Sequence, residues 1–371
     1  MGSQIQSLPN RFIDGISQVC IVVTQFERAV QELALRFGIG PFKCWHYKPP
    51  RLFHTTFRGE EALWTMKLGI TWIGKTQLEV IQPLEGPSLY QQYLQAHGEG
   101  IHHLMVTTGN RNFNQAMERF VSAGFSAGQG ARLKVPIQIG PFTLPPLPRR
   151  LDNLLGTQIV YLATEESLKT VLELVKLPPW LFRLGLKIGK PDYWVPADQR
   201  DFHESLPHHF ISQISKIGFV TRDLDQTIRS YADRVGIGPW KVYTLGSAQL
   251  SRLKMRGQET RFRVRLALTK VGDKLLEIVQ PLEGHSFYQE ILETSGEGIH
   301  YLGITPGELP FSRAIERFLA LGCPVAMEGS IENCYRFSFL ETKLYAATAL
   351  ELISIPFEEI PEALEQVKSY P

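Results

Sequence analysis

The sequence predicts an α+β protein that contains the same domain twice. Two observations support this prediction: several segments recur in one register, and each copy combines short apolar strand-like runs with an amphipathic helix. With 371 residues, the chain is long enough for two domains that each bury a core. Hydrophobic residues make up 43% of the chain and charged residues 20%, which is typical of a globular protein.

The internal repeat determines the domain organisation. The segments 39–42, 79–86 and 98–102 return as 237–240, 277–284 and 296–300, always 198 positions later. Past Gly128 the offset falls to 178, so the first copy carries a 20-residue insertion. We therefore predict a first domain over 1–175 with a Pro-rich insertion at 132–156, a Pro- and aromatic-containing linker at 176–213, and a second domain over 214–371.

Within each copy the pattern predicts one strand, one helix and further strands, twice over. The run from Val19 to Val23 suits a buried strand. Between Phe26 and Phe37, apolar residues recur at helical spacing and form one stripe, and Gly38 with Pro41 ends the helix. Further strands are expected at 63–72 and 77–81, a second set runs from 101 to 175, and the second copy repeats the plan from 214 to 355.

Charge and composition exclude several classes of function. The formal net charge of +2 is close to zero, which argues against binding to nucleic acid or to a membrane surface. No apolar run reaches the length of a membrane span, and residues 1–14 lack the apolar region of a secretory signal. The four cysteines, at positions 20, 44, 323 and 334, are too scattered for a disulfide framework. We expect a cytoplasmic protein.

The element order, with Gln77–Gly86 followed by Gly98–His103, resembles the vicinal-oxygen-chelate (glyoxalase/bleomycin-resistance/dioxygenase) superfamily. Within this superfamily, the sequence of these two segments is most similar to the methylmalonyl-CoA epimerase and glyoxalase I-like branch. The resemblance implies that each domain consists of two βαβββ modules, which form a half-open barrel around one divalent metal. It also implies the ligand positions in the first copy, from the first and last strands of each module: Gln18, Glu79, His103 and Glu173.

The equivalent positions of the second copy are Lys216, Glu277, Tyr301 and Glu351. A protonated lysine has no lone pair and a neutral tyrosine is a poor ligand, so this site is degenerate. We expect the Lys216 ammonium to lie between Glu277 and Glu351, in place of the metal. The alternative is a metal-free pocket that binds a ligand or a partner.

The residues themselves agree with a metal site in the first copy. Glu79 and Glu173 lie in apolar strands, where a carboxylate is costly without a compensating cation. Two carboxylates, an imidazole and an amide suit Zn²⁺, Ni²⁺, Co²⁺ or Mn²⁺. Strand alternation places His103 on the opposite face from His102. Both copies have a histidine at this position, His102 in the first and His300 in the second. Because the copy without a complete ligand set also has it, we expect a packing or supporting role for this histidine.

These residues favour metal-assisted enolisation of a small carbonyl compound or an acyl thioester, as in an isomerase or lyase. The resemblance implies Glu173 as the first candidate for the base, with Glu79 as the second. A stripe of arginines in the second copy is a candidate site for an anionic part of the substrate, and its members are Arg261, Arg263 and Arg265.

Two alternative functions remain open at this point. A non-catalytic protein that sequesters a ligand would agree with the degenerate second copy. An extradiol or 4-hydroxyphenylpyruvate-type dioxygenase would need two histidines in the second copy, which offers none at a ligand position, so this alternative is the weakest. The sequence is compatible with a monomer or a homodimer.

Overall fold

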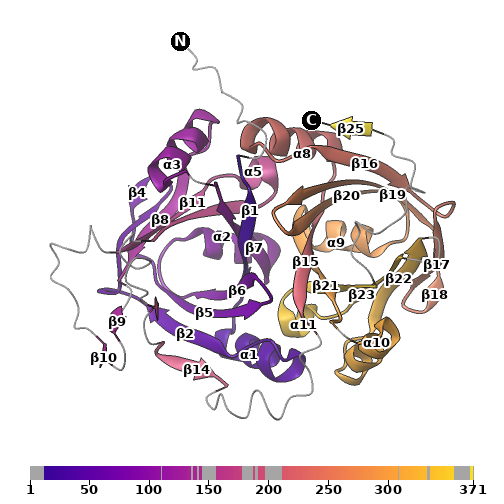
Figure 1. Cartoon of the computed structure of the whole chain (residues 1–371), viewed down its shortest axis with the longest axis horizontal. Helices are drawn as coiled ribbons and strands as arrows, with labels where there is room; N and C mark the ends of the chain where they lie inside the picture. Colours follow the sequence, from indigo (N-terminus) through magenta and orange to yellow (C-terminus); the bar gives the residue numbers. More distant parts are fainter. Residues whose placement is uncertain are drawn as a thin grey trace.

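The computed structural model describes residues 12–109, 111–134, 156–177, 191–196, 211–307, 309–331, 335–354 and 369–370, and the backbone of 137–139, 142–143, 187–188 and 368. Most of the 132–156 insertion and much of the 176–213 linker therefore lie outside the described residues. Two eleven-stranded mixed sheets contain nearly all the strands, one in each half of the chain (Figure 1).

The first sheet has the strand order β14-β2-β5-β6-β1-β7-β12-β11-β8-β3-β4. In chain order its strands are β1 (Gly15–Val22), β2 (Phe42–Tyr47), β3 (Leu52–Phe57), β4 (Glu60–Glu61), β5 (Met66–Ile73), β6 (Thr76–Pro83), β7 (Gly100–Thr107), β8 (Ala127–Leu133), β11 (Thr157–Leu162), β12 (Val171–Lys176) and β14 (Tyr193–Val195). Four residues, 48–51, connect β2 near one edge of this order to β3 near the other edge. The sheet must therefore curl back on itself, which gives the barrel seen in Figure 1.

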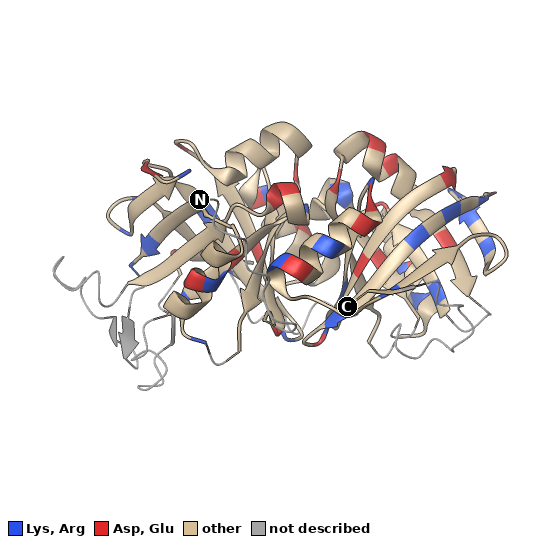
Figure 2. Ribbon diagram, turned by 90° about the horizontal axis from the view of Figure 1, so that it is seen from above, with Lys and Arg blue, Asp and Glu red and all other residues tan. Residues whose placement is uncertain are grey.

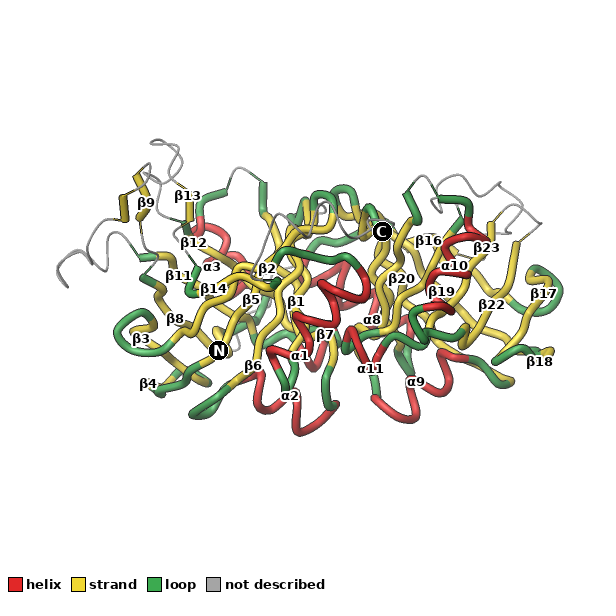
Figure 3. The backbone as a smooth tube through the Cα atoms, turned by 90° about the horizontal axis from the view of Figure 1, so that it is seen from below, coloured by secondary structure: helices red, strands yellow, loops and turns green. Residues whose placement is uncertain are grey.

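The helices of the first half are α1 (Phe26–Gln31), which continues as the π-helical turn η1 (Glu32–Arg36), α2 (Leu89–His97), α3 (Phe113–Ser122) and α5 (Glu165–Leu168). The apolar stripe predicted for 26–37 is buried along α1 and η1, since Phe26, Val30, Leu33 and Phe37 are at most 2% exposed. Helix α2 closes one end of the barrel, and the strands β9 (Ile137–Ile139) and β13 (Lys187–Ile188) lie on the opposite side (Figure 3). With β10 (Phe142–Thr143) they form a separate small sheet.

The second half repeats this plan, with the strand order β18-β17-β22-β23-β24-β21-β15-β20-β19-β16-β25. Its strands are β15 (Gln213–Val220), β16 (Trp240–Leu245), β17 (Leu250–Met255), β18 (Gln258–Glu259), β19 (Phe262–Val271), β20 (Lys274–Gly284), β21 (Gly298–Thr305), β22 (Val325–Ile331), β23 (Tyr335–Leu340), β24 (Ala349–Ile353) and β25 (Lys368–Tyr370). Its helical segments are α8 (Leu224–Arg229), η2 (Ser230–Arg234), α9 (Phe287–Ser295), α10 (Phe311–Ala320) and α11 (Lys343–Ala346). The predicted α+β fold of tandem domains is confirmed.

The described part of the predicted linker includes a strand of the first sheet. Strand β14 pairs with β2, and Asp192 just before it accepts hydrogen bonds from the Arg51 guanidinium and the backbone N–H of His46. In the second sheet, β25 pairs with β16 in the same way. Each barrel is thus extended by a segment that follows its last core strand.

The hydrophobic core has three parts. One lies inside each barrel, and the third is shared by the two halves. The rings of Phe37 and Phe318 meet in this shared core, and the Tyr231 hydroxyl donates a hydrogen bond to the Leu168 carbonyl. The two barrels are consequently packed against each other side by side (Figure 1). None of the described helices is long and apolar enough to cross a membrane.

Candidate metal centre

Four adjacent strands of the first sheet, β6, β1, β7 and β12, carry the ligand positions predicted for the first copy. Cys20 of β1 is the direct cross-strand partner of both Glu79 and His103, so these three side chains share one face of the sheet. Glu173 on β12 is paired with Met105, two residues beyond His103, and so extends from the same face. All four ligand positions therefore belong to one sheet.

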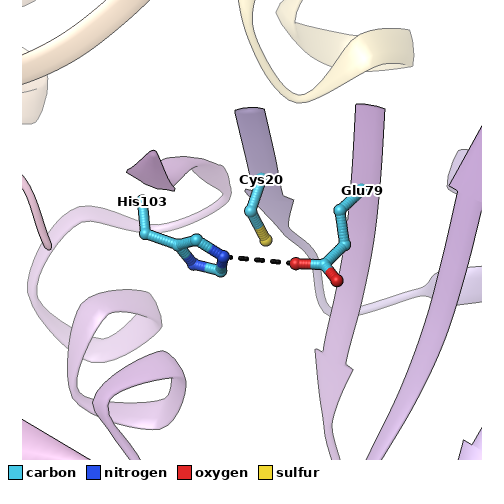
Figure 4. A group of neighbouring side chains, drawn as sticks. All are labelled: Cys20, Glu79 and His103. Carbon is cyan, nitrogen blue, oxygen red and sulfur yellow. Dashed lines mark ion pairs between the residues drawn. The ribbon is translucent and has the colours of Figure 1, made fainter. Parts of the chain in front are cut away.

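The structure brings Glu79, His103 and Glu173 into contact inside the barrel. The Nε2 atom of His103 lies 3.2 Å from Oε2 of Glu79 and 3.4 Å from Oε2 of Glu173. Figure 4 shows the first of these pairs, with the Cys20 side chain beside it. Gln18, Glu79, His103 and Glu173 are all at most 4% exposed. The charged groups are thus shielded from water.

His102 lies beside His103, contrary to the expectation from simple alternation. The pairing of β1 with β7 shifts between Cys20–His103 and Ile21–Ile101, so His102 is the extra residue of a β-bulge. The bulge brings the Nδ1 atoms of the two histidines to 2.9 Å. The sequence could not predict this irregularity, because it depends on how two distant strands are paired.

The bulge determines which ring nitrogen of His103 faces the carboxylates. Burial lowers the pKa of His102 well below its usual value, so its ring is neutral. The pKa of His103 is raised to about 9, so its ring carries a hydrogen on both nitrogens at neutral pH, and its Nδ1–H donates to Nδ1 of the neutral His102. In a neutral His103, Nε2 then presents a lone pair to Glu79 and Glu173. Such a convergence of acceptors requires a cation or a proton between them.

Several buried polar atoms at this site have no hydrogen-bond partner, and they show whether a metal ion would fit. Glu79 Oε2, His103 Nε2 and Glu173 Oε2 are buried without a hydrogen-bond partner. The amide nitrogen of Gln18 also lacks a partner, but as an N–H donor it is not a metal ligand. Ligand bonds of about 2.1 Å place neighbouring ligand atoms about 3.0–3.4 Å apart in octahedral or tetrahedral geometry. The two distances from His103 Nε2 lie in this range. The donor set suits a divalent cation.

Without a metal, a proton takes the place of the cation. Burial lowers the pKa of His103, but the ion pairs with the Glu173 and Glu79 carboxylates outweigh it and raise the pKa to about 9. Burial, together with the nearby Glu173, raises the pKa of Glu79, against the opposing effect of His103. A metal ion bound at this position would therefore displace a proton from His103 at neutral pH.

In the second copy, Lys216 lies between the two glutamates. Its Nζ atom is 2.6 Å from Oε2 of Glu277 and 2.6 Å from Oε2 of Glu351. Their charges outweigh burial and raise the pKa of Lys216, so its ammonium stays charged. The Tyr301 hydroxyl donates a hydrogen bond to Glu277 Oε2 at 3.2 Å. The four degenerate positions thus form a buried ion-pair cluster.

The two copies also differ at the position of Cys20, which is Gly218 in the second copy. A Cβ atom on Gly218 would lie 2.0 Å from the Tyr301 ring. The tyrosine ring therefore occupies the space that the Cys20 side chain takes in the first copy. The prediction of ligands overlooked Cys20, although it lies two residues after Gln18 and hence on the same strand face.

The arginines of the predicted stripe have different partners and do not form one common site. Arg265 is bound to Asp225 at 2.9 Å, and Arg263 is paired with Glu283. Arg261 and Arg263 line a surface hollow of about 630 Å³, which Arg265 does not reach. Figure 2 shows basic residues along the strands at this outer end of the second barrel. The predicted linker also contains histidines at positions 203, 208 and 209, which lie outside the described residues.

Comparisons with known proteins agree with this architecture. The family model of the Glyoxalase/Bleomycin resistance protein/Dioxygenase superfamily matches residues 17–134 and 215–337. A search of curated proteins finds no match. Among solved structures, a triple mutant of 4-hydroxymandelate synthase from Streptomyces coelicolor is similar, with a TM-score of 0.51, 13% identity and coverage of 93% of each chain.

Two further solved structures are similar in fold. A xylose isomerase-like TIM barrel/4-hydroxyphenylpyruvate dioxygenase fusion protein has a TM-score of 0.51 and 11% identity, over 98% of this chain and 51% of that one. This chain thus spans about half the length of the fusion protein. The Mn(II)-bound glyoxalase from Novosphingobium aromaticivorans has a TM-score of 0.44 and 10% identity, over 92% of this chain and 82% of that one. With one family model matching both halves, the chain belongs to the glyoxalase/bleomycin resistance protein/dioxygenase superfamily.

Proposed function

We propose that the first barrel binds one divalent metal ion and that the protein is an isomerase or lyase acting on a small carbonyl compound or an acyl thioester. The observation that carries this proposal is the convergence of three buried, unpartnered acceptors from Glu79, His103 and Glu173. These residues, with Gln18 beside them, would hold Zn²⁺, Ni²⁺, Co²⁺ or Mn²⁺. When bound, the ion would act as a Lewis acid that stabilises negative charge on a substrate oxygen.

The protein's own residues would bind the substrate and move the proton. Aromatic rings pack in the interior of the barrel, among them Trp45, Trp64 and Tyr161, and would exclude water from the reacting carbon. Tyr90 from α2 packs on the ring of His103 at the end of the barrel that α2 closes (Figure 3). Glu173 would accept the proton from the carbon next to the carbonyl and return it, with Glu79 as the second candidate.

The test combines metal analysis with proton exchange. Protein purified without added metal should contain one equivalent of a divalent ion, and Glu79→Gln should lose it. With a panel of small carbonyl compounds and acyl thioesters in D₂O, the wild type should exchange the proton next to the carbonyl of its substrate. Glu173→Gln should lower this exchange by a factor of about 10² or more. Glu61→Gln, an exposed residue of β4, should change neither result.

Other outcomes would favour the alternatives. A metal-free protein that small ligands nevertheless protect against unfolding would indicate a sequestering function, which agrees with the closed ion-pair cluster of the second barrel. Iron bound through the second barrel would indicate a dioxygenase, but Lys216 occupies that position. Either result would contradict the proposed isomerase or lyase.

A further inference from the structure

We infer that Cys20 is a sulfur ligand of the metal ion in the first barrel, together with Glu79 and His103. The inference rests on the proposed metal site and concerns its composition and the class of ion it takes. Cys20 lies at the centre of β1, with Glu79 and His103 as its two cross-strand partners. The sheet register alone thus places a thiol between a carboxylate and an imidazole.

The side-chain geometry supports the same set. Among the described residues, Cys20, Glu79 and His103 form one group in which the potential ligand atoms all lie within 4.8 Å of one another. Glu173 is not part of this group and contacts it through His103 Nε2. Figure 4 shows the Cys20 sulfur pointing toward the space between the His103 ring and the Glu79 carboxylate.

The other described cysteines have a different environment. Cys44 and Cys323 are buried in the shared apolar core. All three sulfurs, that of Cys20 included, lie 3.7–3.9 Å from a backbone carbonyl, so this contact does not distinguish them. Cys20 instead belongs to the barrel interior and faces ionisable groups. A buried cysteine is ordinarily a small apolar residue, so the placement beside two metal-ligating side chains distinguishes this one.

The second copy shows the same position without a thiol. There the equivalent residue is Gly218, and the site is filled by the Tyr301 ring and the Lys216 ammonium. The thiol and the imidazole are present together in the copy whose cation must come from solution. They are absent together in the copy that supplies its own cation.

A sulfur ligand has two chemical consequences. The inference replaces Glu173 by Cys20 in the set of metal ligands. A thiolate and the Glu79 carboxylate together neutralise the charge of a divalent ion, so the Glu173 carboxylate is left for proton transfer. Thiolates bind Zn²⁺ and Co²⁺ well, whereas Mn²⁺ prefers oxygen ligands. Three protein ligands with one open position are typical of catalytic zinc sites. The structure thus favours a thiophilic ion over Mn²⁺.

Substitution with Co²⁺ tests the inference by absorption spectroscopy. We expect the wild type to show an intense near-ultraviolet band from sulfur-to-cobalt charge transfer, together with weaker visible ligand-field bands. Cys20→Ser should lose the charge-transfer band and keep the ligand-field bands. Cys44→Ser, a matched buried cysteine of the same domain, should keep both. Ligand-field bands without charge transfer in the wild type, or charge transfer retained in Cys20→Ser, would overturn the sulfur ligand while leaving the metal site intact.

Failure of the whole site gives a different result, because a protein that binds no Co²⁺ shows neither type of band. That outcome would overturn the proposed function and this inference together. A competition measurement with Cys20→Ala completes the test. The affinity for Zn²⁺ should fall by at least about tenfold and that for Mn²⁺ by less than about threefold. Equal losses for both ions would contradict a sulfur ligand.

Discussion

His102 determines which tautomer His103 adopts, and thereby whether its Nε2 atom is available as a ligand. Metal-binding histidines usually donate their second ring N–H to a fixed acceptor, which orients the ring and raises its basicity. Here the acceptor is another imidazole, with the two Nδ1 atoms 2.9 Å apart. The equivalent His300 instead bonds through Nε2 to the Gly296 carbonyl, at 2.8 Å. Of these two equivalent histidines, His102 contacts a residue that is predicted to bind the metal and His300 does not.

The substitution His102→Phe tests this role. A phenyl ring can keep the packing against Tyr90 and Tyr93 but leaves the Nδ1–H of His103 without an acceptor. We expect the affinity for Zn²⁺ to fall about 10- to 100-fold, measured by titration calorimetry. His300→Phe is the matched control and should leave the affinity unchanged. Equal affinities for wild type and His102→Phe would contradict the role of His102.

The Lys216 ammonium should be essential for the stability of the second barrel at neutral pH. Lys216→Met leaves Glu277 and Glu351 buried without their cation, which should cost roughly 3–5 kcal/mol of unfolding free energy. In the wild type, burial already raises the pKa of Glu351 to about 7, against the effect of Lys216. An acid whose pKa is higher in the folded state destabilises the fold as pH rises from its unfolded pKa through the folded value.

The loss in Lys216→Met should therefore grow from about pH 4.5 upward and be smallest in acid, where both carboxyls are protonated. Urea unfolding between pH 4 and 8 measures this dependence. The triple variant Lys216→Met/Glu277→Gln/Glu351→Gln should recover most of the lost stability, because no buried charge remains. A pH-independent loss, or no recovery in the triple variant, would be inconsistent with an ion-pair cluster.

At the level of strands, the two barrels use the same pairing of the first strand with its two neighbours to support different interiors. In β1 a cysteine stands opposite a histidine, whereas in β15 a glycine stands opposite a tyrosine. The summed volume of the two facing side chains is similar in the cysteine–histidine pair and in the glycine–tyrosine pair. Close packing of the interior explains why a small residue must face the large ring.

The substitution Gly218→Ala should accordingly destabilise the second barrel. Its Cβ would lie 2.0 Å from the Tyr301 ring, which is itself fixed by the hydrogen bond to Glu277. We expect a loss of roughly 1–3 kcal/mol, measured as a lower midpoint of urea unfolding. Gly246→Ala, where the nearest atom would be 3.5 Å away, is the control and should change little. A stable Gly218→Ala would show that the strands can separate at this point.

The periodicity of the chain predicted the helix along 26–37, the strands that carry Glu79 and Glu173, and the duplication, because each depends on neighbouring residues in the sequence. The bulge at His102 depends on the pairing of β1 with β7 and could not be predicted. Cys20 could have been found from alternation with Gln18. The edge strand β14 could not, since only the folded barrel shows that an edge of β2 is free to pair.

At the scale of the whole molecule, the two barrels hold each other through reciprocal contacts. Arg36 donates a hydrogen bond to the Leu321 carbonyl, and its equivalent Arg234 donates to the Ala123 carbonyl. Arg36 also stacks on Tyr345, and Arg234 on Phe125. Because donor and acceptor are exchanged between the copies, the interface has approximate two-fold symmetry. A duplicated chain thus forms the contacts that two identical domains would form in a symmetric dimer.

This shared interface predicts that the two barrels unfold together. The apolar core around Phe37 and Phe318 belongs to both halves, so the unfolding of either barrel exposes it to water. We expect one calorimetric transition, and Zn²⁺ should shift that whole transition although it binds only in the first barrel. At a free concentration of about 100 times Kd, the stabilisation should be about 2.7 kcal/mol. The variant Glu79→Gln should unfold in one transition that Zn²⁺ does not shift. Two separate transitions, with only one responding to the metal, would show instead that the barrels are thermodynamically independent despite their common core.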